Sequence, residues 1–135
     1  MVHLKNRAQF QAVLNAGTMA RTTHFVLHVL ALDPPVMDES ARPLFGQSAI
    51  WMGAMAPKRW AKRAVTRNTI KRQIFAVSRE FEPLLPQAAH VVRLRCGFDR
   101  GHFISATSLA LKNAIRQELF QLFGRATQGQ APVSP

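Results

Sequence analysis

Apolar residues recur every three to four positions in three stretches of the chain, which is the spacing of one face of an α-helix. We therefore predict helices over residues 4–16, 64–81 and 105–123. The middle helix has the clearest apolar stripe, which runs through Ile70, Ile74, Val77 and Phe81. Gly17 and Gly124 stand where a C′ glycine closes a helix, so we expect them to end the other two.

Runs rich in apolar residues lie between these helices and predict strands over residues 24–32, 48–56 and 90–96, with a brief further strand over 57–63. Prolines and acidic residues fill 33–43, which we expect to be a solvated loop. The resulting order, α-β-β-β-α-β-α, predicts an α+β fold, a two-layer sandwich of helices on one sheet. We expect a single domain over residues 1–123 and a disordered polar tail over 124–135.

The chain is strongly basic. Its 135 residues include 18 Lys and Arg against 7 Asp and Glu, which gives a net charge of +11. A small folded protein this basic usually binds a polyanion, since each phosphate that it neutralises releases a condensed counterion. An anionic membrane surface could attract the same charge, but no apolar run is long enough to span a bilayer. A single cysteine and an N-terminus without the apolar stretch of a secretory signal lead us to expect a cytoplasmic protein.

The positive charge is concentrated in one segment of the chain. No acidic residue occurs from Ser40 to Arg79, whereas nine of the 18 basic residues do. A solvated surface is the alternative, but such a surface normally intersperses acids that relieve the repulsion, so a polyanionic partner is favoured. The N-terminus of the helix over 64–81 also favours phosphate. The candidate RNA-binding residues are Lys58, Arg59, Lys62, Arg63, Arg67, Asn68, Lys71, Arg72 and Arg79.

Two motifs in this chain resemble those of the bacterial ribonuclease P protein family. The first, Arg67-Asn68-Thr69-Ile70-Lys71-Arg72, resembles the signature Arg-Asn-x-x-Lys-Arg of that family. The second is Phe10-x-x-Val13-x-x-x-Gly17 followed by Phe25-Val26-Leu27. The motifs occur in the family's order in a chain of similar length, and the resemblance spans residues 3–123.

The resemblance implies a function and a set of partners. It implies a protein subunit of ribonuclease P that binds the catalytic RNA and the 5′ leader of precursor tRNA, and so assists endonucleolytic removal of the leader. The active site of this endoribonuclease would lie in the RNA, and Mg²⁺ would be held mainly by RNA and substrate. No DNA or membrane partner is implied. The implied fold contains a βαβ crossover of the uncommon left hand.

The resemblance also implies a groove between the first helix and the sheet, which holds the single-stranded leader. The family tends to be aromatic there; Phe10 keeps this character, whereas Leu14 and His28 replace typical aromatics. The alternative is that all three residues belong to the core. On the basic helix, Thr69 and Phe75 stand where the family often has basic residues.

The sequence offers no catalytic constellation of its own. The histidines lack the spacing of a zinc site, and no pair of acids is placed for general acid–base chemistry. We therefore assign no catalytic residue and no firm metal ligand, and we disfavour a self-sufficient nuclease. A basic ribosomal or other structural RNA-binding protein remains the alternative function. Trp60 lies among cations, where it could stack on a base or cover the sheet edge.

Overall fold

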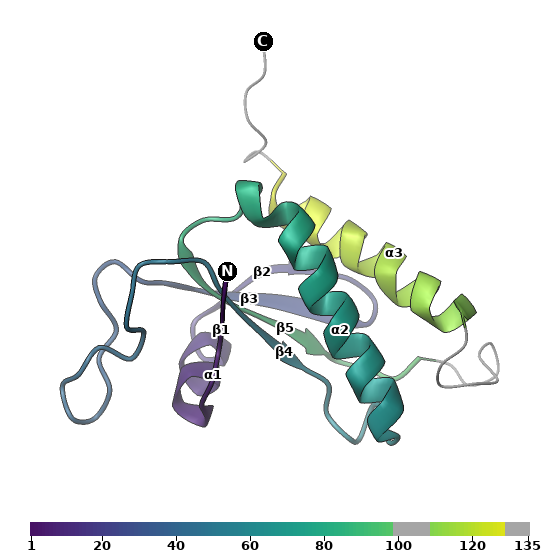
Figure 1. Ribbon diagram of the computed structural model, residues 1–135, viewed down its shortest axis with the longest axis horizontal. Helices are drawn as coiled ribbons and strands as arrows, with labels where there is room; N and C mark the ends of the chain where they lie inside the picture. The colour runs from purple at the N-terminus through teal and green to yellow at the C-terminus, as the bar shows by residue number, and fades with distance from the viewer. Residues whose placement is uncertain (99–108, 129–135) are drawn as a thin grey trace, which may run out of the picture.

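The computed structural model of the chain describes residues 1–98 and 109–128 (Figure 1). Within these ranges it has an α+β fold, as predicted, with three α-helices and one mixed sheet of five strands. In chain order the elements are β1 (Val2–His3), α1 (Arg7–Leu14), β2 (Gly17–Arg21), β3 (Phe25–Ala31), β4 (Trp51–Met55), α2 (Ala64–Phe81), the 3₁₀ helix η1 (Glu82–Leu84), β5 (Ala88–Leu94) and α3 (Leu109–Ala126).

The predicted order lacks the first strand, because the structure has the order β-α-β-β-β-α-β-α. Strands β1 and β2 were not expected from the pattern, and β1 has only two residues. Helix α1 ends at Leu14 with Asn15 as its C-cap, so Gly17 does not close the helix as expected but begins β2. The predicted strand over 57–63 is instead a turn, in which the amides of Trp60 and Ala61 both donate to the carbonyl oxygen of Pro57. Proline has no amide hydrogen to offer a strand ladder, which favours the turn.

The strands lie in the order β1-β4-β5-β3-β2. Strand β5 pairs in parallel with β4 and antiparallel with β3, so it occupies the centre of the sheet. Helix α2 connects β4 to β5 and completes a βαβ unit. On the outer side of β4, the two residues of β1 pair only with Trp51 and Met52, which leaves the rest of that edge without a strand.

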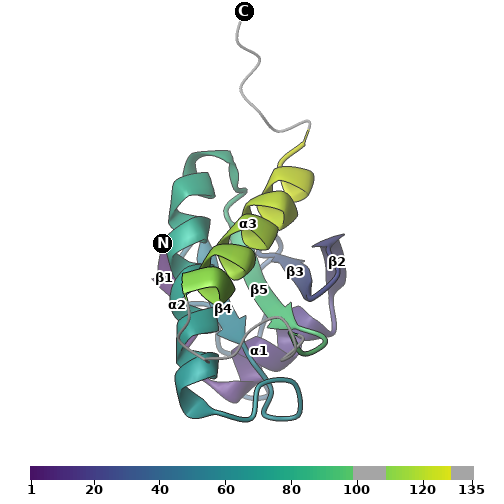
Figure 2. The ribbon, with the colours of Figure 1, turned by 90° about the vertical axis from the view of Figure 1, so that its right-hand side faces the viewer.

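The two-layer arrangement is also corrected. Helices α2 and α3 lie side by side on one face of the sheet, and α1 covers the opposite face (Figures 1 and 2). Leu27 and Val92 pack with α2 and α3, whereas Val91 packs with Val13 of α1. Strand β5 is buried without interruption over 88–92, and a strand that is apolar on both faces needs a cover on each.

The helical stripes explain how the larger core forms. Ile70, Ile74 and Val77 of α2 are buried as predicted. Helix α3 continues past Gly124 to Ala126, so the expected end at Gly124 is wrong, and Ala126 adds to the core. Residues 105–108 and 129–135, which belong to the predicted helix and tail, lie outside the described residues. No helix in the described part of the chain is long and apolar enough to cross a membrane.

Candidate RNA interface

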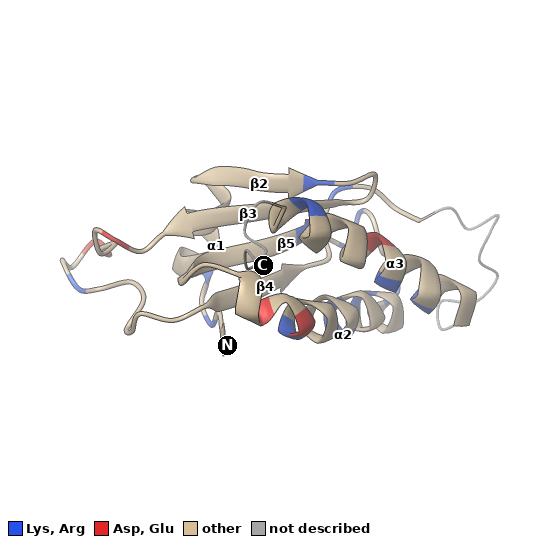
Figure 3. Ribbon diagram, turned by 90° about the horizontal axis from the view of Figure 1, so that it is seen from above, with Lys and Arg blue, Asp and Glu red and all other residues tan. Residues whose placement is uncertain are grey.

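The predicted basic residues lie along α2 and on the turn before it, and all except Arg67 are exposed. The exposed members are Lys58, Arg59, Lys62, Arg63, Asn68, Lys71, Arg72 and Arg79. No ion pair within the described residues joins one of these cations to a carboxylate. The acidic residues that the structure describes lie on the β3–β4 loop, at the C-terminal end of α2 next to Arg79, and on α3 (Figure 3). Arg79 is farther along α2, about 10 Å beyond Arg72 along the helix axis.

Arg67 differs from its neighbours because it is half-buried and its guanidinium is engaged. Its Nη1 donates to the carbonyl oxygens of Ala61 and Lys62, at 3.0 and 2.8 Å. These bonds tie the first turns of α2 to the basic turn that precedes the helix. Arg67 therefore stabilises the conformation of the basic turn, and it also contributes its own charge to the surface.

The two positions where the family often has basic residues face inward or sideways in this chain. Thr69 is buried, and its hydroxyl donates to the carbonyl oxygen of Val65. The ring of Phe75 stacks on His3, with the ring centroids 4.0 Å apart. Both side chains serve packing here, so this part of α2 presents fewer cations than the resemblance implies.

Helix α1 is held against the sheet by its N-terminal cap. The side chain of Asn6 accepts from the amide of Gln9, and the side chain of Gln9 accepts in return from the amide of Asn6. Gln9 is buried and also donates to the carbonyl oxygen of Leu44, at 3.0 Å. A capping box of this kind satisfies amides at the start of a helix and fixes its orientation.

Phe10 approaches β4 closely because residue 53 is a glycine. A Cβ atom at Gly53 would lie 2.6 Å from the ring of Phe10 and 2.7 Å from the side chain of Leu4. The half-buried ring lines a shallow cavity of about 360 Å³, open to solvent, at the edge of β4 that β1 leaves uncovered. The residues lining the cavity are Arg7, Phe10, Ala54, Met55, Ala56, Pro57 and Lys71. Arg7 comes from α1 and Lys71 from α2, so both helices bring a cation to this cavity.

His28 lies on the same face of the sheet as α1 but does not line the cavity. It pairs with Val91 across the strands, and the Nε of Arg93 donates to its Nε2 at 3.2 Å. Burial lowers the pKa of His28, and the charges of Arg93 and Arg21 lower it further, against a hydrogen bond to the backbone of Gly17. The ring is therefore held neutral, as an acceptor for Arg93. Leu14 is half-buried in the apolar cluster of this face.

Residues 1–126 match the family described as Ribonuclease P. The chain belongs to the ribonuclease P protein family. It is 37% identical over 120 residues to the ribonuclease P protein component of Ralstonia pickettii, covering 89% of this chain and 75% of that one. It is 33% identical over 122 residues to the component of Bordetella parapertussis, covering 90% and 89% of the two chains.

The fold is also similar to the solved structure of the Staphylococcus aureus RNase P protein. The TM-score is 0.65 at 16% sequence identity, with 93% of this chain and 95% of that chain covered. The resemblance first suggested by two motifs is thus confirmed. This ribonuclease P protein is a component of an endoribonuclease holoenzyme that processes the 5′ end of precursor tRNA, and its partner is the RNA of that enzyme. A ribosomal role is no longer the alternative.

Three cations on the α1 side of the sheet were not among the predicted site residues: Arg7, Arg21 and Arg93. Sequence signals point to two of them, Arg7 and Arg93. Arg7 precedes Phe10 by three positions, which puts both on one face of a helix. Arg93 interrupts the apolar positions of a strand whose neighbours are buried, and a charge in such a strand needs a partner or an outlet to solvent.

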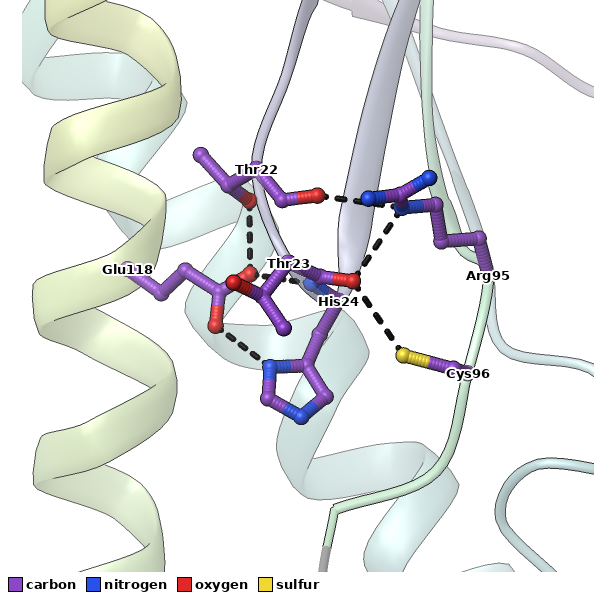
Figure 4. Close-up of polar contacts among 6 residues, drawn as sticks. All are labelled: Thr22, Thr23, His24, Arg95, Cys96 and Glu118. Carbon is purple, nitrogen blue, oxygen red and sulfur yellow. Dashed lines mark hydrogen bonds and ion pairs between the residues drawn. The ribbon is translucent and has the colours of Figure 1, made fainter.

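A cluster of hydrogen bonds in this ribonuclease P protein holds the β2–β3 turn in place. The Glu118 carboxylate of α3 accepts from the Thr22 hydroxyl, from the His24 amide and from His24 Nδ1, at 2.6, 2.7 and 2.6 Å (Figure 4). On the other side of the same turn, Arg95 Nε and Cys96 Sγ donate to the carbonyl oxygen of Thr23. These bonds fasten the β2–β3 turn between α3 and the end of β5. Within the described residues, no group of three or more His, Cys, Asp or Glu could hold a metal ion.

Proposed function

We propose that this ribonuclease P protein binds the catalytic RNA through its basic turn and α2, and the 5′ leader of precursor tRNA through the cavity beside β4. The observation that carries the proposal is the position of Lys71. This residue belongs to the signature on α2, and it lines the same cavity as Phe10 and Arg7 of α1. Single-stranded RNA bound along the exposed cations of α2 can therefore continue past Lys71 into the cavity.

The cavity suits a single-stranded nucleotide. Its volume of about 360 Å³ lies in the range of small-ligand sites. Phe10 offers an aromatic face on which any base can stack, and Arg7 and Lys71 offer cations for the flanking phosphates. Leu14 cannot stack in this way, and His28 is occupied by Arg93, so Phe10 is the leading leader contact.

The proposed division of labour leaves the chemistry to the RNA. Mg²⁺ prefers several oxygen ligands, usually with carboxylates among them, and the cavity is lined by cations and apolar side chains instead. These residues do not fit a Mg²⁺ site, which supports metal held by RNA and substrate. The protein would neutralise phosphates and position the leader. We further propose a cytoplasmic location and the left-handed β4–α2–β5 crossover that the resemblance implies.

A cleavage assay tests the division of labour. Precursor tRNA should be cleaved by the catalytic RNA, and addition of the protein should raise activity at low Mg²⁺ because its cations replace part of the metal requirement. The protein without RNA should cleave nothing. Specific cleavage by protein freed of RNA would contradict the proposal.

A salt titration tests the basic surface. Lys71→Ala should lower the slope of log affinity against log salt by about 0.7–0.9, since one phosphate contact is lost. Lys112→Ala is the matched control, because Lys112 is an exposed cation on α3, outside the proposed surface. An unchanged slope for Lys71→Ala, or an equal loss for Lys112→Ala, would point to another binding surface.

A further inference from the structure

We propose that Trp60 and Arg59 form a stacking platform for one unpaired nucleotide of RNA, separate from the leader cavity. The inference rests on the RNA-binding function proposed above and adds a site to it. The ligand is a nucleobase that is free to leave its own helix. It could belong to the catalytic RNA or to precursor tRNA, and the two sources are separated below.

The first observation is that Trp60 is more exposed than its small neighbour Ala61. Trp60 and Ala61 are neighbours in the turn before α2, and the small alanine is buried in the core at 6% exposure. The tryptophan is 37% exposed. A large aromatic side chain stabilises a fold most when it is buried, so an exposed one next to a buried alanine points to binding.

The second observation is the surroundings of the ring. The guanidinium carbon of Arg59 lies 5.2 Å from the centre of the Trp60 ring, within cation–π range. Lys58, Lys62 and Arg63 are exposed on the same turn. An aromatic face among exposed cations is the combination that binds single-stranded nucleic acid, because the base stacks while its phosphates are neutralised.

The third observation is that the turn is held rigidly, so the platform exists before RNA arrives. The Trp60 amide donates to the Pro57 carbonyl oxygen at 3.0 Å, and Arg67 donates to the carbonyl oxygens of Ala61 and Lys62. On the other side the turn lies against Gly97, where an added Cβ would be 2.9 Å from the Trp60 carbonyl oxygen. A preformed ring loses little conformational freedom when a base stacks on it.

The chain offers a matched internal control for a fluorescence test. It contains two tryptophans and no tyrosine, so tryptophan dominates its emission. Trp51 is 5% exposed, packs edge-on against Phe45 and donates its indole N–H to the carbonyl oxygen of Gln47. A Trp51→Phe variant of the full chain reports on Trp60 alone, and a Trp60→Phe variant reports on Trp51 alone.

The test titrates each variant with single-stranded RNA and with an abasic ribose-phosphate strand of the same length. Emission from Trp60 should be quenched by RNA and hardly at all by the abasic strand, whereas Trp51 should respond to neither. Equal quenching of Trp60 by both strands would overturn the proposal, because the contact would then be with phosphate. Should Trp51→Phe fail to fold, the difference between the parent protein and Trp60→Phe gives the same readout.

Affinity provides an independent measurement. Trp60→Ala should weaken single-stranded RNA binding by about five- to 150-fold, the usual value of one base–aromatic stack, and Trp60→Phe should restore most of it. The salt slope should stay unchanged, since no cation is removed. No loss of affinity, or a loss that appears as a lower slope, would contradict stacking; a lower slope would mean that Trp60 only positions Arg59.

The source of the nucleotide follows from the same readout with natural RNAs. Quenching of Trp60 by the catalytic RNA alone assigns the nucleotide to that RNA, and quenching only after precursor tRNA is added assigns it to the substrate. No quenching by either would overturn the proposal. That failure is distinguishable from failure of the proposed function, because the salt slope of Lys71→Ala does not depend on Trp60.

Discussion

The two faces of the sheet are built from alternate residues of the same strands, yet one face is fully covered and the other is partly open. On one face, α2 and α3 close an apolar core in which Ile74, Ile115 and Leu119 are fully buried. On the other face, α1 leaves Phe10 and Leu14 half-buried, beside a cavity and a polar pair of His28 and Arg93.

Helix length explains the difference. Helices α2 and α3 have 18 residues each and α1 has eight, which corresponds to about 27 and 12 Å of helix. Five strands span about 20 Å between the outer two, so α1 cannot cross the whole face. The part of the sheet that a short helix leaves open is where a ligand can reach it. Here that part is bordered by cations, which suits RNA.

The largest effect is expected on the closed face. Phe123 of α3 is fully buried and stacks on Phe81 of α2, and Phe123→Ala should lower the free energy of unfolding by about 3–5 kcal/mol. Chemical denaturation measures the change. Leu14→Ala on the open face is the comparison, and it should cost clearly less because Leu14 is half-buried. Equal losses would mean that the two faces do not differ in the way proposed.

The next effect is expected in binding rather than in stability. Phe10→Ala should weaken binding of precursor tRNA with a leader of several nucleotides by about 1–3 kcal/mol, because one stacking surface is lost. Binding of mature tRNA should hardly change. Affinities for long-leader and leaderless RNA decide the matter, with circular dichroism as the check on folding. If both RNAs are weakened equally, or the protein unfolds, Phe10 belongs to the core.

A smaller substitution tests the close approach of α1. Gly53→Ala adds a methyl group where the ring of Phe10 lies, and overpacking of this kind costs about 1–3 kcal/mol or displaces the ring. We expect weaker leader binding in the same assay. Gly46→Ala is the control, because a Cβ there meets no atom within 4 Å. Unchanged leader binding in Gly53→Ala would mean that the affinity for the leader does not depend on the close approach of Phe10 to β4.

The smallest effect concerns one histidine on each face. Burial lowers the pKa of His90, as it does for His28, from the ordinary value of 6.5. Near pH 6.5 these two histidines therefore bind protons in the unfolded chain but stay neutral in the folded chain. The free energy of unfolding should consequently fall as the pH falls through that value, by at most about 1.4 kcal/mol per pH unit for each histidine. Unfolding measured from about pH 8 to pH 5 checks this.

Bound RNA should sharpen the contrast between these histidines. A phosphate near the open face favours the charged form of His28, whereas His90 is enclosed on the closed face. NMR titration with and without leader RNA should therefore show a raised pKa for His28 alone. A shift of both, or of neither, would contradict the assignment of the open face to RNA.

The closed face was largely predictable from the sequence. Helix α2 occupies the predicted residues 64–81, and three of its four predicted stripe residues are buried, with Phe81 half-buried against Phe120 and Phe123. Trp51 is buried as predicted as well, but on the α1 face of the sheet. A long amphipathic helix reports its own buried face, because the period of its apolar residues depends on local geometry alone. The exposed basic residues of α2 were predictable for the same reason.

The sequence by itself determined the helices, the apolar strands, the basic segment and the family, since each is a property of residues close together in the chain. The tertiary structure alone decided that α1 covers its own face, that Gly53 admits the ring of Phe10, and that Lys71 lines the same cavity. These features depend on the order of strands in the sheet and on contacts between distant residues, and no local period carries that information.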